Sequence, residues 1–164
     1  GIATGRVAIP LRRAGVAIHG IEASPAMLAA LRERPDAAGI PVVAGDFAST
    51  PLGGPFQLIY SLVSTFSLLT TLELQRACLR NIAAHLTPGG CFVSENFDGA
   101  GSFPQVDTHE HRIDTPSGVQ SYRVSCLNTP LAMVDAMAAD SGLRLAARWS
   151  NWTNCPRRVR SWMR

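Results

Sequence analysis

Lysine is absent from the sequence, and all fifteen basic residues are arginine. The net charge is +3, and four of the positive charges come from arginines at the end of the chain, so the remainder carries a net charge of −1. A nucleic-acid-binding surface requires a basic face in the body of the fold, and the sequence shows none. The arginine-only, alanine-rich composition is typical of a GC-rich bacterial genome.

Paired cysteines are also missing. None of the four cysteines, at positions 78, 91, 126 and 155, belongs to a CxxC pair, so the usual spacing of a zinc site is lacking. Cys78 and Cys91 lie in strongly apolar segments, where we expect buried free thiols. The chain opens without the features of a signal peptide, and no apolar run approaches the length of a membrane span. We therefore expect a cytoplasmic protein with no metal, membrane or nucleic acid partner.

Hydrophobic residues make up 46% of the 164 residues, which suffices for the core of a single domain over residues 1–164. Short apolar runs predict strands near 16–21, 40–44, 56–61 and 91–97. Segments with helical spacing lie between them, at about 6–13, 24–34 and 71–86. Strands that are apolar on both faces and alternate with helices indicate an α/β fold with a mostly parallel sheet.

The signal weakens after residue 98, where a polar stretch reaches residue 118. Beyond it the pattern predicts a strand at 119–126, a helix at 130–141 and a strand at 143–149, whose Trp149 we assign to the core. Residues 151–164 have no clear period.

Polar or small residues follow each predicted strand, at the edge where open parallel sheets bind ligands. The loop Gly1–Gly5 leads into the first helix, and its small residues allow a ligand to approach the backbone. Glu22 can accept hydrogen bonds from ribose hydroxyls. Asp46 and Phe47 together suit an adenine ring and its amino group, and Ser61 stands at the end of the third strand. Glu22 as a helix cap and Asp46 as a turn residue are the structural alternatives.

In this order, the features resemble the class I S-adenosylmethionine-dependent methyltransferases, specifically the small-molecule type with a core like methyltransferase domain 25. The matching stretches are GIATGRVAIPLRRAGVAIHGIEASPAMLAALRER, VVAGDF, FQLIYSLVSTFSLLT and LRNIAAHLTPGGCFVSENF. The resemblance implies a Rossmann-like, doubly wound sheet, S-adenosylmethionine as cofactor and methyl transfer to a small-molecule acceptor. It covers residues 1–98, the cofactor-binding core, better than residues 99–164, the substrate side.

The resemblance also implies roles for individual residues. Three small residues of the first loop would line the methionine part of the cofactor, and Glu22 would bind the ribose hydroxyls. Ala23 and Met27 would lie beside the adenine. The full set of implied cofactor residues is Gly1, Ala3, Gly5, Glu22, Ala23, Met27, Asp46, Phe47 and, along the methionine side, Ser61.

Three departures from the family pattern lead to further expectations. The family motif begins with a strand and an acidic residue before its first glycine, so we expect an N-terminally truncated domain that lacks the first central strand. The middle glycine is replaced by Ala3, which is expected to tighten the loop. Residues 154–164 fit the family's closing antiparallel strand poorly, which predicts an altered or truncated end.

Other interpretations remain open. A nicotinamide-dependent dehydrogenase shares the strand, glycine loop and acid, but Arg6 stands where its third glycine is needed. A degenerate methyltransferase without activity is the stronger rival. His109 and His111 lie in the polar stretch and are either candidates for a catalytic base that deprotonates the acceptor or part of a solvated loop.

Overall fold

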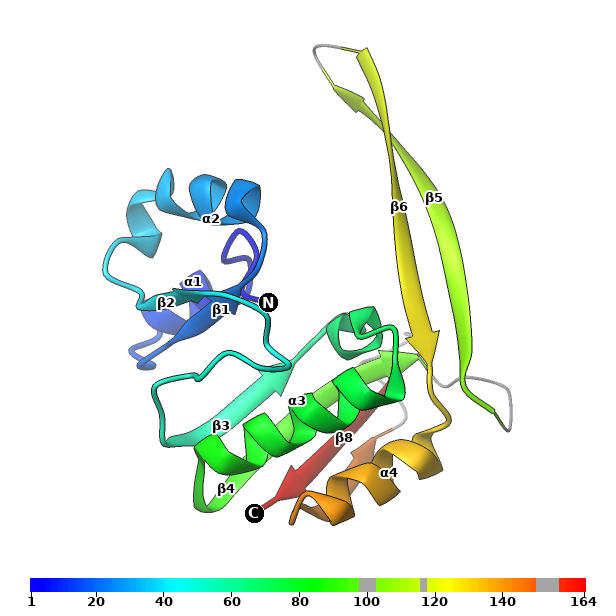
Figure 1. Ribbon diagram of the computed structural model, residues 1–164. Helices are drawn as coiled ribbons and strands as arrows, with labels where there is room; N and C mark the ends of the chain where they lie inside the picture. Colours follow the sequence, from blue (N-terminus) through cyan, green and yellow to red (C-terminus); the bar gives the residue numbers. More distant parts are fainter. Residues whose placement is uncertain (98–102, 116–117, 150–156) are drawn as a thin grey trace. The chain divides into compact units, whose positions relative to one another are not determined.

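The computed structural model describes residues 1–97, 103–115, 118–149 and 157–164 (Figure 1). The chain divides into two compact units, Gly1–Gly54 and Pro55–Arg164. Strands and helices alternate in the first unit and in much of the second, and the predicted α/β class is confirmed. Within these described ranges, no helix has the length and apolar character needed to span a membrane.

The smaller unit contains two short parallel strands, two α-helices and a 3-10 helix. Its elements in chain order are α1 (Ala8–Arg13), β1 (Gly20–Glu22), α2 (Pro25–Arg32), the 3-10 helix η1 (Pro35–Ala37) and β2 (Val42–Ala44). β1 and β2 pair in parallel, with Gly20 opposite Val42 and Glu22 opposite Ala44. The strand predicted at 16–21 therefore begins later in the structure, because pairing with β2 starts only at Gly20. Ile18 packs against the core from outside the ladder.

Local sequence explains where α2 begins. Ser24 has an extended backbone, and its hydroxyl accepts a hydrogen bond from the Met27 N–H at 3.3 Å. Pro25 occupies the first helical position, where its missing N–H removes no intrahelical bond. Leu28 and Leu31 on this helix are buried, as their spacing predicts.

Gly5 lies at the centre of this unit's packing, between α1 and α2. It is buried and has φ +80°. A Cβ atom there would lie 2.6 Å from Leu31 Cδ1 and 2.9 Å from Ile9 Cδ1. The core around it consists of Ala8, Ile9, Leu31, Ala37 and Ile40. Gly5 is therefore required both by backbone conformation and by the close packing of two core side chains.

The larger unit is built on a four-stranded sheet in the order β3-β4-β8-β7. β3 and β4 are parallel, and β8 runs antiparallel between β4 and β7. A separate two-stranded sheet is formed by β5 and β6. The elements in chain order are β3 (Phe56–Ser61), the 3-10 helix η2 (Thr65–Leu68), α3 (Leu72–His85), β4 (Leu86–Phe97), β5 (Gln105–Thr115), β6 (Gly118–Asn128), α4 (Leu131–Asp140), β7 (Arg144–Trp149) and β8 (Arg157–Met163).

The poor fit expected for the end of the chain is wrong for residues 157–163, which form β8 in the interior of the sheet. Trp162 is fully buried, and its ring stacks on Phe92 of the neighbouring strand with centroids 5.4 Å apart. Arg160 is also buried, which breaks the alternation of polar and apolar residues that sequence patterns detect. Residues 154–156 lie outside the described ranges.

The interpretation of the polar stretch before residue 118 as a solvated loop is wrong for residues 105–115, which form β5. β5 pairs with β6 along its whole length in a long antiparallel hairpin (Figure 1). Polar cross-strand pairs hold it: the Thr108 and Ser125 hydroxyls lie 2.8 Å apart, and Glu110 faces Arg123. Most of the hairpin is exposed on both faces, so the apolar alternation of a half-buried strand is missing.

Two assignments to the core are corrected. Trp149 is 48% exposed, because it lies at the end of the edge strand β7. Cys91 is only partly buried, whereas Cys78 on α3 is buried as predicted. Cys155 lies outside the described residues.

Asp135 on α4 is the main polar link between that helix and the sheet. Its Oδ2 atom accepts hydrogen bonds from Arg148 of β7, at 3.1 Å, and from Arg160 of β8. Its Oδ1 atom accepts a hydrogen bond from Trp162 Nε1 at 3.2 Å. The Arg160 and Asp135 side chains are only 10% and 17% exposed. Removing the carboxylate would leave the buried indole N–H without its acceptor and the buried Arg160 guanidinium without its ion-pair partner, although the guanidinium would still donate to the Leu131 carbonyl oxygen at 3.4 Å.

We predict that Asp135→Ala lowers the free energy of unfolding by about 3 kcal/mol, because one partner of a largely buried ion pair is lost. Urea unfolding followed by circular dichroism measures this loss. Asp140→Ala, at the exposed end of the same helix, is the matched control and should change the stability by less than about 0.5 kcal/mol. Equal effects of the two substitutions would show that Asp135 contributes only helix propensity.

A second prediction compares two glycines that both have left-handed backbone. Gly15 has φ +86° and no atom within 4 Å of a Cβ position, whereas Gly5 is crowded. Both Gly→Ala substitutions carry the left-handed penalty of about 1–2 kcal/mol. Gly5→Ala adds an overpacking cost of about 1–3 kcal/mol. Thermal unfolding should therefore show a clearly larger loss of stability for Gly5→Ala than for Gly15→Ala. An equal or smaller loss of stability for Gly5→Ala would contradict the packing role.

Candidate functional site

Glu22 lies at the carboxyl end of β1, where its carboxylate joins two loops of the smaller unit. Oε2 accepts a hydrogen bond from the Ala3 N–H and Oε1 accepts one from the Ser24 N–H, each at 2.9 Å. The predicted capping role is thus present, since Glu22 satisfies an N–H at the start of α2. A carboxylate has about four acceptor positions, so these two bonds leave capacity for ligand hydroxyls.

The loop Gly1–Gly5 is pressed against this carboxylate. A Cβ atom on Gly1 would lie 2.5 Å from Glu22 Oε2, so only glycine fits without displacing the side chain. Ala3 has φ +49°, a left-handed conformation that is uncommon for a residue with a side chain. The Ala3 N–H is held by Glu22. The replacement of the family's middle glycine by Ala3 therefore leaves a strained position that the glutamate stabilises.

Asp46 follows β2, the strand beside β1. Its Oδ1 atom accepts a hydrogen bond from the Ala48 N–H at 2.7 Å, so the predicted turn role is also real. The Gly45 N–H donates to the Glu22 carbonyl oxygen at 3.0 Å, which fixes the two strand ends beside each other. Asp46, Ala23 and Met27 are exposed, and Phe47 is half-buried. All predicted cofactor residues except Ser61 thus belong to the smaller unit.

Ser61 belongs to the larger unit, where it ends β3 opposite Ser94 of β4. Its hydroxyl is buried and has no hydrogen-bond partner among the described residues. The next loop contains Val63 and Ser64, both with φ +56°. Glu95, buried near the end of β4, accepts the Val63 N–H on Oε2 at 2.8 Å.

Glu95 is absent from the predicted site although the sequence signals it. It is a carboxylate near the carboxyl end of a predicted strand, which is the criterion that selected Glu22 and Asp46. The predicted site takes residues only from the first loop and from the ends of the first three predicted strands, and none from the strand predicted at 91–97.

His109 and His111 lie on β5 of the hairpin, and both are exposed. His109 is opposite Val124, and the His111 ring stacks on Tyr122 with centroids 5.2 Å apart. A role as catalytic base remains a prediction for both histidines.

Among the residues that the structure describes, Tyr60 and Cys126 have shifted pKa values, and neither shift produces a reactive group. Burial raises the pKa of the Tyr60 hydroxyl. Burial, and to a smaller extent the Asp107 carboxylate, raise the pKa of the Cys126 thiol. A raised thiol pKa lowers the fraction of nucleophilic thiolate. In the described part of the chain, no cluster of three histidine, cysteine or acidic residues is arranged to hold a metal ion.

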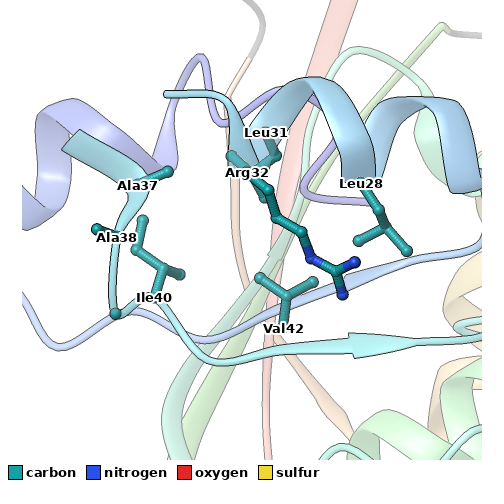
Figure 2. Close-up of a pocket in the computed structure, with 8 residues that line it drawn as sticks. Leu28, Leu31, Arg32, Ala37, Ala38, Ile40 and Val42 are labelled. Carbon is teal, nitrogen blue, oxygen red and sulfur yellow. The ribbon is translucent and has the colours of Figure 1, made fainter. Parts of the chain in front are cut away.

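A cavity of about 230 Å³ lies between α2 and the segment that leads into β2 (Figure 2). Figure 2 shows the Arg32 side chain reaching along it, with Leu28 and Val42 nearby. This volume is below the range of roughly 300–1,000 Å³ usual for ligand pockets. None of the predicted cofactor residues lines it; the lining residues are Leu28, Leu31, Arg32, Ala37, Ala38, Gly39, Ile40 and Val42.

Solved structures share this fold over nearly the whole chain. The CcbJ methyltransferase from Streptomyces caelestis superposes with a TM-score of 0.84 and 24% identity, covering 99% of this chain and 80% of that one. A sugar N-methyltransferase from a Streptoalloteichus species gives 0.80 and 21%, covering 99% and 77%. An amino pentose methyltransferase from Micromonospora echinaspora, solved with S-adenosylmethionine bound, gives 0.75 and 24%, covering 100% and 80%. At these identities the similarity shows the fold, which is that of the class I methyltransferases.

Sequence comparison supplies the family. A curated relative, a dTDP-4-amino-2,3,4,6-tetradeoxy-D-glucose N,N-dimethyltransferase from Saccharopolyspora spinosa, is 38% identical over 79 residues. The match covers 48% of this chain but only 30% of that relative. The family described as a methyltransferase domain matches residues 1–90, more than half of the chain. The chain therefore belongs to the methyltransferase domain family that its strand-end residues resemble.

Proposed function

We propose that this chain binds S-adenosylmethionine and serves in the transfer of a methyl group to an amino group of a small molecule. The observation that carries the proposal is the carboxylate of Glu22, which lies at the end of β1 in direct contact with the glycine loop. Ligands of open α/β sheets bind at this edge. A carboxylate there with spare acceptor capacity suits a diol.

The residues of the smaller unit fit the adenosine part of the cofactor. Glu22 would accept hydrogen bonds from the ribose hydroxyls, and Asp46 would accept one from the adenine amino group. Met27 and Phe47 would supply apolar contacts to the ring. Gly1 has no room for a side chain beside the carboxylate, which leaves backbone at the ligand surface. Ser61 stays a prediction for the methionine side.

The choice of an amine as acceptor rests on the named activities of the relatives. The Saccharopolyspora protein is an N,N-dimethyltransferase of an amino sugar nucleotide. One of the solved structures is a sugar N-methyltransferase, and another is an amino pentose methyltransferase. S-adenosylmethionine supplies a methyl group that its sulfonium already activates, so the task of the protein is mainly to bind and align the two reactants. The family match favours methyl transfer over the hydride transfer of a nicotinamide enzyme.

The proposal is tested by Asp46→Asn, because asparagine can keep the turn bond to Ala48 while it loses the charge and one acceptor oxygen. Loss of a hydrogen bond to a charged acceptor costs about 1.5–3 kcal/mol, so affinity for S-adenosylmethionine should fall about ten- to a hundredfold. Isothermal titration calorimetry of the whole protein provides the measurement.

Asp36→Asn is the control, since Asp36 is an exposed carboxylate of the same unit that pairs with Arg13. This variant should bind the cofactor like the parent. Equal affinity of parent and Asp46→Asn would remove Asp46 from the site. A parent protein that does not bind S-adenosylmethionine would overturn the proposed function and support the degenerate methyltransferase instead.

A further inference from the structure

The hairpin of β5 and β6 lacks the cover that a two-stranded sheet needs in water. Each strand has eleven residues, and their ladder runs from Gln105 opposite Asn128 to Thr115 opposite Gly118. In the described part of the chain this sheet has no third strand, and the side chains of residues 108–114 and 118–123 are all exposed. An isolated hairpin is at best marginally stable, and a third strand or a packed helix is needed to stabilise it. A further element beside this hairpin is therefore expected.

The outer edge of β5 is the place where such an element can pair. The other strand, β6, is held at its end: Leu127 is buried, and its carbonyl oxygen accepts a hydrogen bond from Gln75 of α3 at 3.5 Å. On β5 the side chains of residues 105, 106 and 108–114 are exposed. In an antiparallel pair, alternate residues direct their N–H and C=O groups away from the partner strand. β5 therefore presents a row of these groups along its outer edge.

β5 also lacks the usual devices that prevent an edge strand from pairing with another chain. Such devices include a proline, a bulge or a lysine. Residues 105–115 contain neither proline nor lysine, and the ladder with β6 has no register shift. The side chains of Glu110, Arg112 and Asp114 share one face of the strand, because they are two residues apart. Charges of both signs on one face can attract or repel a second strand, so the register decides whether pairing is favourable.

A second copy of β5 is complementary to this edge. When two identical strands pair antiparallel about a two-fold axis, one residue lies opposite itself, and residues equally distant from it on either side face each other. With His111 at the axis, Glu110 of each copy faces Arg112 of the other copy. The overlap then covers residues 107–115, which is most of the strand. Opposite charges that face each other across two strands stabilise the pairing.

Other symmetric registers are less favourable. With Glu110 at the axis, the two copies of this glutamate face each other, and with Arg112 at the axis the two arginines do. Like charges in such positions destabilise a sheet. Arg112 also faces a carboxylate, that of Asp114, when Ile113 lies at the axis, but the overlap is then confined to residues 111–115. The register centred on His111 combines attraction on both sides of the axis with a long overlap.

We propose that two copies of this chain associate through β5 in the register centred on His111, so that their hairpins form one antiparallel sheet of four strands. The pairing gives each hairpin its third strand. It also gives partners to the outward N–H and C=O groups of β5 within the overlap. The inference does not depend on the proposed function, because it uses no residue of the proposed cofactor site.

Arg112→Glu tests the register, because it places glutamates opposite each other on both sides of the axis. Within its own hairpin Arg112 lies opposite Ser121, and its ion pair with Glu110, at 3.7 Å, is exposed. The substitution therefore disturbs the single chain little. Sedimentation velocity of the whole protein should give the parent twice the mass of one chain. Arg112→Glu should weaken the dimer at least about tenfold.

Two further variants separate the register from the general effect of charge. Asp114→Arg changes a carboxylate on the same strand and face, but in the proposed register Asp114 faces Thr108. This variant should therefore dimerise like the parent. Glu110→Arg alone should be monomeric, since arginines then face each other. An equal mixture of Glu110→Arg and Arg112→Glu should associate, because every arginine of one copy faces a glutamate of the other copy. Circular dichroism of each variant shows whether it is folded like the parent.

Four results would overturn the proposal. A parent that sediments as a single chain at micromolar concentrations would exclude the second copy and leave the hairpin to a different partner. A parent dimer that Arg112→Glu does not weaken would have its interface elsewhere. Dissociation by Asp114→Arg to the same extent would exclude the register centred on His111. Failure of the mixed variants to associate, with the circular dichroism of the parent, would exclude the contact between Glu110 and Arg112.

Discussion

Backbone in the left-handed region, fixed by a glutamate at a strand end, is the constraint on which the loops at two strand ends depend. Within the described residues, the non-glycine positions with positive φ are Ala3, Val63 and Ser64. Each donates its N–H to a glutamate, through the side chain or the carbonyl oxygen. A carboxylate can hold a tight loop where hydrogen bonding to a strand is impossible, because it accepts N–H groups from several directions. The loops therefore keep a shape that their own residues disfavour.

Such loops need a firm base, and each unit supplies one differently. In the smaller unit, Gly5 lets Ile9 and Leu31 pack closely directly after the glycine loop. In the larger unit, the stacked rings of Phe92 and Trp162 join β4 to β8. The hydrogen bonds of Asp135 join α4 to β8. Buried Gln75 on α3 adds a link, since its side chain bonds to the Leu69 carbonyl and to the Thr129 hydroxyl. The strand carrying Glu95 is thus restrained on both sides.

The sequence predicted those parts of the fold that depend on local signals. Ser24 and Pro25 mark the start of α2, and the apolar spacing of α3 identifies its buried face, because capping and periodicity act within a few residues. β8 and β5 were not predicted, since Arg160 is buried by a partner on another element and the hairpin is held by polar pairs. Glu22 and Asp46 were predicted as site residues from their positions after strands, and their cofactor roles stay predictions. The left-handed conformation of Val63 and Ser64 could not be predicted, because neither residue type indicates a positive φ.

The central place of β8 has a consequence for how the larger unit reaches its native state. β4 is complete by residue 97, but its partner β8 lies near the end of the chain, and their ladder pairs residues as distant in sequence as Cys91 and Met163. Contacts of such long sequence separation form slowly, because a large loop must close first. Until then β4 presents an open edge with unpaired backbone groups, which is a template for association with other chains. Self-association during refolding should therefore depend on how soon β8 pairs with β4. In the folded protein β4 is paired on both sides, so this risk is confined to the refolding chain.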